Sequence, residues 1–324
     1  MKIGLTYDLR SDYLKEGFSL EETAEFDKEE TIEGIENALQ ELGFQTERIG
    51  HAKSLINALQ AGKKWDLVFN ICEGMYGDGR ESLVPALLDA YKIKYVFSGP
   101  VTLGISLNKA FTKHIVRDAG ILTPDFFVIH QVSDIENCQL PFPLFAKPVA
   151  EGTGKGIENK SVIKSKEQLN EIAKKLLKQF NQPVLIETFL PGREFTVGIV
   201  GNGHEARVVG AMEILYAENT SNIYSMYNKE NYEDVVKYAN VTDELLAKCT
   251  EISLKAWKVL NCFDGGRVDL RADENGNLNF LEVNPLAGLN LIHSDLPIIA
   301  KMNGISFKSL ISEIVNAAIK RYGK

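Results

Sequence analysis

Apolar runs and helical patterns alternate over the first hundred residues of the chain. Strands are expected over 2–7, 65–71 and 95–97, and helices over 29–42 and 83–91. Strands that alternate with helices predict a parallel sheet. Because ligands bind beyond the carboxyl ends of the strands in such sheets, the loops 8–27 and 72–81 are candidate substrate loops. A plain surface turn is the alternative for the second loop, which is rich in glycine.

The pattern changes near residue 102, where we expect a boundary. Helices are expected over 106–119, 169–180, 243–260 and 306–322, and strands over 126–129, 142–148, 183–190, 193–200 and 211–216. A polar, tyrosine-rich connection, 217–240, follows the last of these strands and contains Lys229. Loops of this length are commonly lids or binding loops, so a lid is expected here, with a disordered segment as the alternative.

The stretch 265–285 alternates about the dipeptide Asn275-Gly276 and predicts a β-hairpin. Asn-Gly favours a two-residue type I′ turn, because that turn needs positive φ at both central residues. With this loop, Asp269 lies directly opposite Glu282, and Arg267 lies opposite Asn284. A loop of three or four residues would shift the register and break the facing pair.

Two carboxylates that face each other across a ladder repel, so this pair calls for a neutralising cation. Magnesium takes oxygen ligands and is usually held by one or two carboxylates together with substrate phosphates. Asp269, Glu282 and the amide oxygen of Asn284 are therefore candidate ligands, and Arg267 beside them would stabilise negative charge that develops on a substrate. An exposed acidic hairpin is the alternative reading.

A second candidate site lies where a short apolar strand ends at Lys147. The loop 149–157 that follows holds three glycines, Thr153 and Lys155. Backbone N–H groups in such a loop can approach phosphate oxygens closely, and lysines supply positive charge. The loop matches neither the Walker motif nor the dinucleotide-binding motif, and a hairpin tip is the alternative explanation.

Composition narrows the class of protein. A chain of 324 residues, 44% hydrophobic and 25% charged, suggests an ordinary soluble protein of two or three domains. Its net charge of −8 argues against a general nucleic-acid surface but leaves room for small anionic ligands at local basic sites. Four cysteines without metal-binding spacing indicate free thiols, and no apolar run is long enough for a signal peptide or a membrane span. The cytoplasm is the expected location.

Taken in order, the elements from Lys109 to Asp295 resemble the ATP-grasp superfamily, in its D-alanine–D-alanine ligase branch. The resemblance implies an α/β (α+β) ATP-grasp fold with an N-terminal parallel-sheet domain followed by a two-lobed ATP-grasp module. The implied divisions are a substrate domain over 1–102, a central lobe with the glycine-rich loop over 103–187, and a lobe with the metal and catalytic site over 188–324. ATP, two Mg²⁺ ions that Mn²⁺ can replace, and a homodimer are implied as well.

The resemblance also assigns residue roles by position. The implied nucleotide contacts are the phosphate-binding lysines Lys109 and Lys147, the loop residues Glu151, Gly152, Thr153, Gly154 and Gly156, the adenine linker Glu187, Thr188, Phe189 and Leu190, the ribose-binding Glu194, and Lys229. The implied magnesium ligands are Asp269, Glu282 and Asn284. Arg267 and the backbone N–H of Gly288 match the groups that stabilise the tetrahedral intermediate, and Ser294, beside His293, matches the residue that holds the second substrate's carboxylate.

The chemistry that this assignment implies is carboxylate activation. A substrate carboxylate attacks the γ-phosphate of ATP, and an amine then displaces phosphate from the acyl phosphate to form an amide. Positioning and electrostatics supply most of the catalysis in phosphoryl transfer, which fits a site without a side-chain nucleophile.

The substrate end departs from the family pattern. The family's Gly-Gly-x-Ser-x-Glu-Arg-Glu stretch is replaced by residues 6–10, with Glu25-Phe26-Asp27 downstream, and its His-Gly by Glu73-Gly74. Its Asn-Thr-x-Pro-Gly stretch becomes Asn284-Pro285-Leu286-Ala287-Gly288. Asp8 and Glu73 are therefore candidates for holding a substrate ammonium.

The leading hypothesis is an ATP-dependent ligase that joins the carboxylate of an amino acid or small peptide to an amine. A true D-alanine–D-alanine ligase and a non-catalytic nucleotide-binding regulator are the alternatives. A dinucleotide-dependent oxidoreductase is excluded, because no glycine-rich fingerprint follows the first strand.

Overall fold

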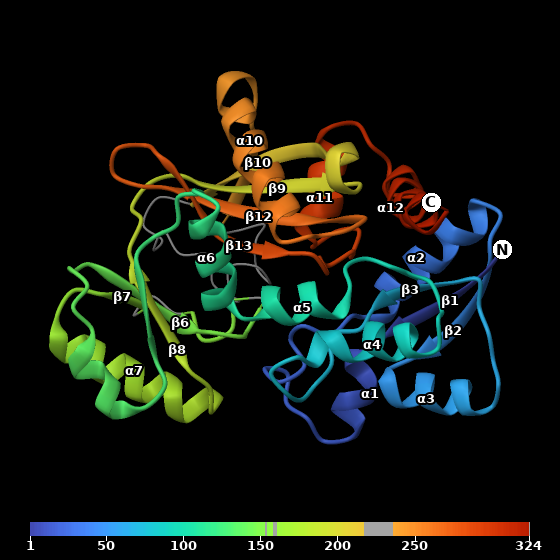
Figure 1. Cartoon of the computed structure of the whole chain (residues 1–324), viewed down its shortest axis with the longest axis horizontal. Coiled ribbons are helices and arrows are strands. Elements are labelled where there is room, and N and C mark those ends of the chain that lie inside the picture. Colours follow the sequence, from blue (N-terminus) through green and yellow to red (C-terminus); the bar gives the residue numbers. More distant parts are fainter. Residues whose placement is uncertain (153, 158–160, 217–235, 324) are drawn as a thin grey trace.

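The computed structural model describes residues 1–152, 154–157, 161–216 and 236–323, which form three sheets with helices around them (Figure 1). The first sheet is parallel, as the sequence predicts. In spatial order its strands are β2 (Gln45–Gly50), β1 (Lys2–Tyr7), β3 (Leu67–Ile71) and β4 (Tyr95–Val96). Its helices are α1 (Arg10–Lys15), α2 (Glu29–Glu41), α3 (Ala52–Gln60) and α4 (Leu83–Ala90). The edge strand β2 was not expected, because most of its residues are polar.

The second sheet is antiparallel and lies on the other side of the molecule in Figure 1. Its strands, in spatial order, are β5 (Phe126–Ile129), β8 (Val184–Thr188), β6 (Leu144–Pro148) and β7 (Val162–Ile163). Helix α7 (Lys166–Phe180) covers one face with a buried stripe that includes Leu169, Ile172 and Leu176. The Ser165 side chain caps this helix by accepting a hydrogen bond from the Gln168 amide.

The third sheet is also antiparallel and carries the predicted hairpin. Its strands, in spatial order, are β11 (Val236–Asn240), β10 (Arg207–Tyr216), β9 (Glu194–Val200), β12 (Gly265–Ala272) and β13 (Leu278–Asn284). Helix α10 (Asp243–Val259) packs on this sheet through the fully buried Trp257. The predicted division into three domains at residues 102 and 187 stays a prediction.

Two helices connect the first sheet to the second, where the sequence predicted one helix over 106–119. They are α5 (Pro100–Leu107) and α6 (Lys109–Asp118), so the predicted helix is confirmed over 109–118, its start at residue 106 was wrong, and α5 was not predicted. The chain breaks at Asn108, which has extended backbone angles (φ −87°, ψ 99°) and whose side chain accepts hydrogen bonds from the Ala110 and Phe111 amides. The break places Lys109 in the first turn of α6.

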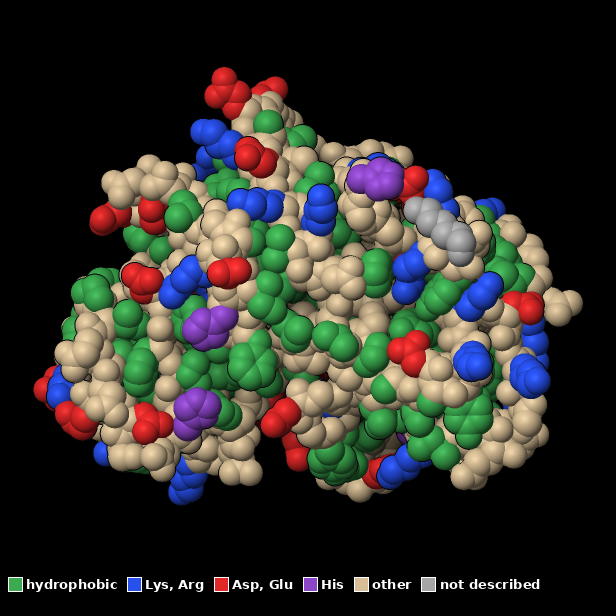
Figure 2. Space-filling view, in the orientation of Figure 1, with side chains coloured by type: hydrophobic (Ala, Val, Ile, Leu, Met, Phe, Trp, Pro, Cys, Tyr) green, Lys and Arg blue, Asp and Glu red, His purple; other side chains and the backbone are tan. Residues whose placement is uncertain are grey.

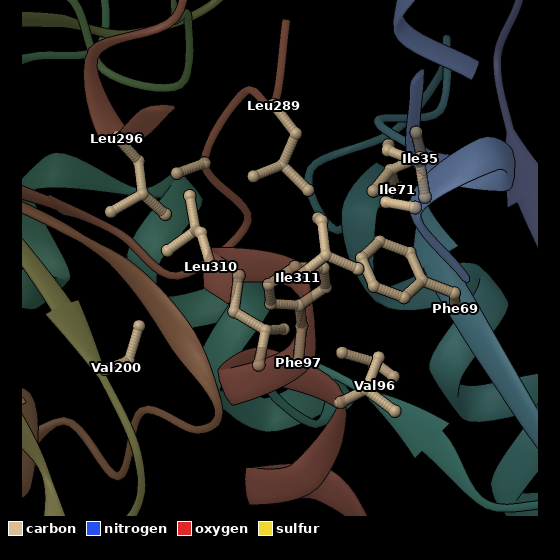
Figure 3. Packing of buried hydrophobic residues seen from close by; sticks show 14 of the residues in the cluster. Ile35, Phe69, Ile71, Val96, Phe97, Val200, Leu289, Leu296, Leu310 and Ile311 are labelled. Carbon is tan, nitrogen blue, oxygen red and sulfur yellow. The ribbon is translucent and has the colours of Figure 1, made fainter. Parts of the chain in front are cut away.

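The C-terminal helices α11 (Asp295–Met302) and α12 (Phe307–Tyr322) return to the beginning of the chain. Figure 3 shows Leu310 and Ile311 of α12 beside Phe69 and Val96 of the first sheet. The buried carboxylate of Asp264 holds this junction, because it accepts hydrogen bonds from the Phe97 amide (2.8 Å) and the Arg321 guanidinium (2.7 Å). The last helix therefore completes the core of the first sheet.

The surface shown in Figure 2 carries interspersed acidic and basic side chains, and it is notched between the second sheet's lobe and the N-terminal region. In the part of the chain that the structure describes, no helix is both long and apolar enough to cross a bilayer. All four cysteines are free thiols, as the sequence predicts.

Candidate active site

The β12–β13 hairpin brings the predicted metal ligands together. Asp269 pairs with Glu282 and Arg267 with Asn284, so the predicted facing pairs are confirmed. The two-residue loop was wrong, since Asp273 pairs with Asn277 (N···O 2.9 Å) around three loop residues that end at Gly276 with φ +82°. The register shifts between Asp269 and the next residue, where Leu281 is the extra residue of a β-bulge, and this bulge restores the facing pair.

The Asp269 carboxylate is almost buried and lies among polar groups. Its Oδ1 accepts a hydrogen bond from Thr196 Oγ1 (3.0 Å), and its Oδ2 is paired with the Arg267 guanidinium and lies 3.3 Å from Asn284 Nδ2. Glu282 Oε2 lies 3.6 Å from Lys109 Nζ. Cationic side chains thus neutralise both carboxylates.

The donor set fits magnesium. A site made of such side chains alone is not found, because no group of three or more His, Cys, Asp or Glu within the described residues could hold a metal ion. Two carboxylates and one amide oxygen, those of Asp269, Glu282 and Asn284, leave the remaining octahedral positions to phosphate oxygens and water, which is how magnesium is usually bound.

A cavity of about 100 Å³ lies between the second and third sheets. The predicted nucleotide contacts that line it are Lys109, Lys147, Glu151, Gly152, Gly154, Glu187, Thr188, Phe189, Leu190 and Glu194, together with Asp269 and Glu282. Gly156 is not part of the lining, and a Cβ atom there would lie 2.8 Å from Phe180 and Pro148. Thr153 and Lys229 lie outside the described residues, so their roles stay predictions. Most of the expected lid over 217–240 lies outside them too, and its end was wrong as a loop, since 236–240 form strand β11 beside β10.

The side chain of Glu187 forms a buried triad with two lysines. Its Oε1 lies 2.9 Å from Lys147 Nζ and its Oε2 lies 2.9 Å from Lys113 Nζ. Lys113 is fully buried and also donates a hydrogen bond to Thr123 Oγ1 (2.9 Å). Burial lowers the pKa of Lys113 to about 8, although the Glu187 carboxylate opposes this shift. The two lysines outweigh burial at Glu187 and hold the pKa of its carboxyl below the usual value.

Glu194, the predicted ribose contact, is anchored at the other end of the same cavity. Its Oε2 accepts a hydrogen bond from the Arg271 guanidinium (2.9 Å), and that guanidinium lies 5.4 Å from the centre of the Phe189 ring. Aromatic, anionic and cationic groups therefore share this end of the cavity.

A larger cavity of about 530 Å³ adjoins the first, because both are lined by Lys109, Glu151, Gly152 and Glu282. It brings the C-terminal residues Arg267, Asn284, Gly288, His293 and Ser294 opposite the N-terminal residues Glu25, Asp27, Glu73 and Glu81. The predicted substrate loops and the predicted catalytic residues thus share one chamber.

Gly288 and Ser294 fit closely against each other in this chamber. A Cβ atom on Gly288 would lie 2.7 Å from Ser294 Oγ, so any other residue there would displace the Ser294 hydroxyl. Ser294 Oγ accepts a hydrogen bond from the Asn290 amide (3.0 Å). In the same chamber, Arg267 Nε lies 3.5 Å from the Asp295 carboxylate. Burial opposes the charge of Arg267, but the neighbouring carboxylates outweigh it and raise the pKa, so the guanidinium stays protonated.

The two residues proposed to hold a substrate ammonium lie in different places. Glu73 lines the larger cavity, whereas Asp8 is not part of the lining. Asp8 is buried and accepts hydrogen bonds from the Tyr13 hydroxyl (2.5 Å) and the Gly74 amide (2.9 Å). It fixes the loop that presents Glu73.

Several charged residues of the site carried no predicted role. They are Arg10, Asp27, Arg80, Glu81, Lys113 and Asp295. Their contacts join segments that are far apart in sequence, and no local motif marks them. The isolated Lys113 in an amphipathic helix was the one available signal, because a charge on a helix's buried side needs a partner.

The arrangement of sheets is that of solved nucleotide-dependent ligases. The crystal structure of the D-alanine–D-alanine ligase from Bacillus anthracis complexed with ATP is similar with a TM-score of 0.75 at 22% identity, and covers 100% of this chain and 99% of that chain. This likeness shows the fold.

Sequence comparison gives the family. A family model described as the D-ala D-ala ligase C-terminus matches residues 115–316. The D-alanine–D-alanine ligase of Aquifex aeolicus (strain VF5) is 35% identical over 287 residues, which are 88% of this chain and 93% of that protein. A protein of Sinorhizobium fredii described as uncharacterized protein y4sG is 30% identical over 88% of this chain and 86% of its own length. The chain belongs to the D-alanine–D-alanine ligase family, and it is an ATP-grasp ligase that forms a carbon–nitrogen bond.

Proposed function

We propose that this ligase joins the carboxylate of one small amino acid to the amine of a second, with an acyl phosphate as the intermediate. The observation that carries the proposal is the meeting of two cavities at Lys109 and Glu282, with Arg267 and Asp269 beside them. One cavity has the lysines and aromatic groups suited to a nucleotide. The other, larger cavity has room for amino-acid substrates.

On the nucleotide side, Lys109 and Lys147 would neutralise phosphate charge. Asp269, Glu282 and the amide oxygen of Asn284 would hold magnesium, which when bound shields the phosphate charge. The ion pair with Glu187 fixes Lys147 for this role. Burial would lower the pKa of Lys147, but Glu187 and other carboxylates outweigh burial and raise it, so the lysine stays charged.

On the substrate side, Arg267 and the Gly288 N–H would stabilise the oxyanion that forms when the amine attacks the acyl phosphate. Ser294 and His293 lie in the same chamber and would contact the second substrate.

The first substrate's ammonium would be held by Glu73 and Glu81. Both line the larger cavity, and burial, reinforced by neighbouring carboxylates, raises the pKa of each carboxyl. An ammonium group would stabilise the ionised carboxylates, because an opposite charge nearby favours the charged form. Glu25 is an unsuitable ligand, since Arg80 already neutralises it (2.9 Å).

The names of the relatives make D-alanine the first substrate to test. Because the substrate loops are altered, a different D-amino acid or a dipeptide is the next substrate to test. The free thiols fit a cytoplasmic enzyme, and a homodimer stays an expectation from the family resemblance.

The test is phosphate release from MgATP with a panel of D- and L-amino acids and dipeptides. Phosphate release that requires a carboxylate–amine pair, together with the amide product in mass spectrometry, supports the proposal. The variant Asp269→Asn with Glu282→Gln should lose at least about a thousandfold in kcat, because both charged metal ligands are gone. Tight ATP binding without turnover on any pair, or turnover by this variant at the parent rate, would refute it.

A further inference from the structure

The glycine-rich loop is held from the N-terminal side by a buried ion cluster. Arg80 donates one guanidinium hydrogen bond to the Ala150 carbonyl (2.9 Å) and another to Glu25 Oε2 (2.9 Å). Glu25 Oε1 in turn accepts a hydrogen bond from the Gly152 amide (2.5 Å). The side chains of Arg80 and Glu25 are only 9% and 7% exposed, so these bonds are shielded from water.

A third member of the cluster comes from the loop itself. Lys155 Nζ lies 3.4 Å from Glu25 Oε2, 3.3 Å from Glu151 Oε2 and 3.4 Å from the Glu22 carbonyl. Burial would raise the pKa of Glu25, but the Arg80 and Lys155 charges outweigh it and lower the pKa. Glu25 is therefore a buried anion that is neutralised from both sides of the junction.

The contact also depends on glycine at position 152. A Cβ atom there would lie 2.7 Å from Glu25 Oε1, so any side chain would push the carboxylate away. Both hydrogen bonds described for the Arg80 guanidinium leave its own loop, 72–81, and end on other segments. A purely local role in folding that loop does not explain this geometry.

Arg80 lines neither cavity, but it joins loops that do. The loop of Arg80 presents Glu73 and Glu81 to the larger cavity. Glu151 and Gly152 follow Ala150, whose carbonyl accepts the Arg80 hydrogen bond, and they line both cavities. We propose that Arg80 is a positioning residue that clamps the glycine-rich loop to the substrate loop, so that ligand binding in one cavity favours binding in the other. The proposal rests on the proposed function for what the cavities bind. Such coupling is reciprocal by thermodynamic necessity.

The first experiment is amide hydrogen exchange by mass spectrometry on the full chain without ligand. Arg80→Gln should speed exchange in residues 149–157 by about tenfold or more, because a buried charged hydrogen bond is lost. Arg80→Lys should show a smaller increase, since an ammonium keeps the charge but lacks the planar fork that reaches both acceptors. Arg207→Gln is the matched control, because that arginine pairs with Glu313 at an exposed site on the C-terminal side.

The second experiment adds magnesium and the ATP analogue AMP-PCP and follows residues 72–82. In the parent chain the analogue should slow exchange in this substrate loop, and in Arg80→Gln the effect should vanish while the analogue binds about tenfold more weakly. If Arg80→Gln is poorly folded by circular dichroism, Lys155→Met provides the same test from the other side of the junction.

Faster exchange confined to 72–82, with 149–157 unchanged, would show that Arg80 supports only its own loop and would overturn the proposal. Protection of 72–82 by the analogue in both parent and Arg80→Gln would overturn it too. The ligand-free experiment needs no ligase activity, so a clamp without turnover would refute the proposed function and leave the clamp standing.

Discussion

The buried triad of Glu187, Lys113 and Lys147 yields an asymmetric prediction. One carboxylate lies 2.9 Å from each of two ammonium groups, so the triad with both lysines protonated carries one net positive charge inside the protein. Glu187→Gln would leave both lysines buried without their nearest counter-charge, and removing one partner of a buried pair costs about 3–5 kcal/mol. We expect this variant to lose that much unfolding free energy.

Lys113→Met should behave in the opposite way. It leaves a neutral Glu187–Lys147 pair and replaces a charge by an apolar chain of similar length. The pKa of Lys113 falls from 10.5 to about 8 on folding, so charging this lysine in place already costs roughly 3 kcal/mol. The substitution removes that cost and should be neutral or stabilising.

The same shift sets the sign of a pH dependence. Because the folded pKa lies below the unfolded one, the unfolded chain binds more protons between pH 8 and 10.5, and Lys113 makes stability rise with pH in that window. Lys113→Met should abolish this contribution to the rise.

The assay is denaturant unfolding followed by circular dichroism for the parent, both single variants and the double variant. The double variant should be more stable than Glu187→Gln alone, because one of the two repelling lysines is gone. If Glu187→Gln loses under about 1 kcal/mol, or if Lys113→Met is the more damaging change, the electrostatic account of this triad is wrong.

Three further predictions concern other sites. Affinity for an ammonium-bearing substrate should rise from about pH 6 to about pH 8, because Glu81, whose pKa burial raises to about 7, ionises in this range; calorimetry should show a smaller rise for Glu81→Gln, in which only Glu73 still titrates, and a parent profile that is already flat would contradict the assignment. Asp264→Asn should cost about 3 kcal/mol of unfolding free energy, because the partly buried Arg321 loses its counter-charge; a melting curve that overlays the parent's would contradict this. Adding dithiothreitol should leave the melting temperature unchanged, since all four cysteines are thiols, and a drop would reveal a disulfide.

The sequence predicted the long, strongly periodic elements because each is marked by local physics, and it missed mainly short or polar ones, among them α3 and β2. Helix α12 begins where Ser306 caps it, as its spacing and hydroxyl indicate. The facing of Asp269 and Glu282 was predicted correctly for an incomplete reason, because a three-residue loop and a bulge compensate for each other. A bulge depends on neighbouring strands and leaves no mark in the hairpin's own alternation.

The substrate side was harder to predict because its charges act across long sequence separations. Asp8 was considered as an ammonium ligand, whereas the structure engages both of its oxygens with Tyr13 and Gly74. Arg80 reads as an ordinary loop arginine until folding places it against Ala150 and Glu25. Charge and loop position indicate that a region binds something, but only tertiary contacts show which charges are already neutralised.

The packing of α12 on the first sheet has a consequence for how the protein is made. The residues that cover Phe69 and Val96 include Leu310 and Ile311, at the opposite end of the chain. During synthesis the ribosome delivers the sheet long before the helix that shields it, so the nascent N-terminal segment keeps an apolar face exposed until α12 has been translated. A stop codon just before α12 would therefore damage the part of the protein that was translated first.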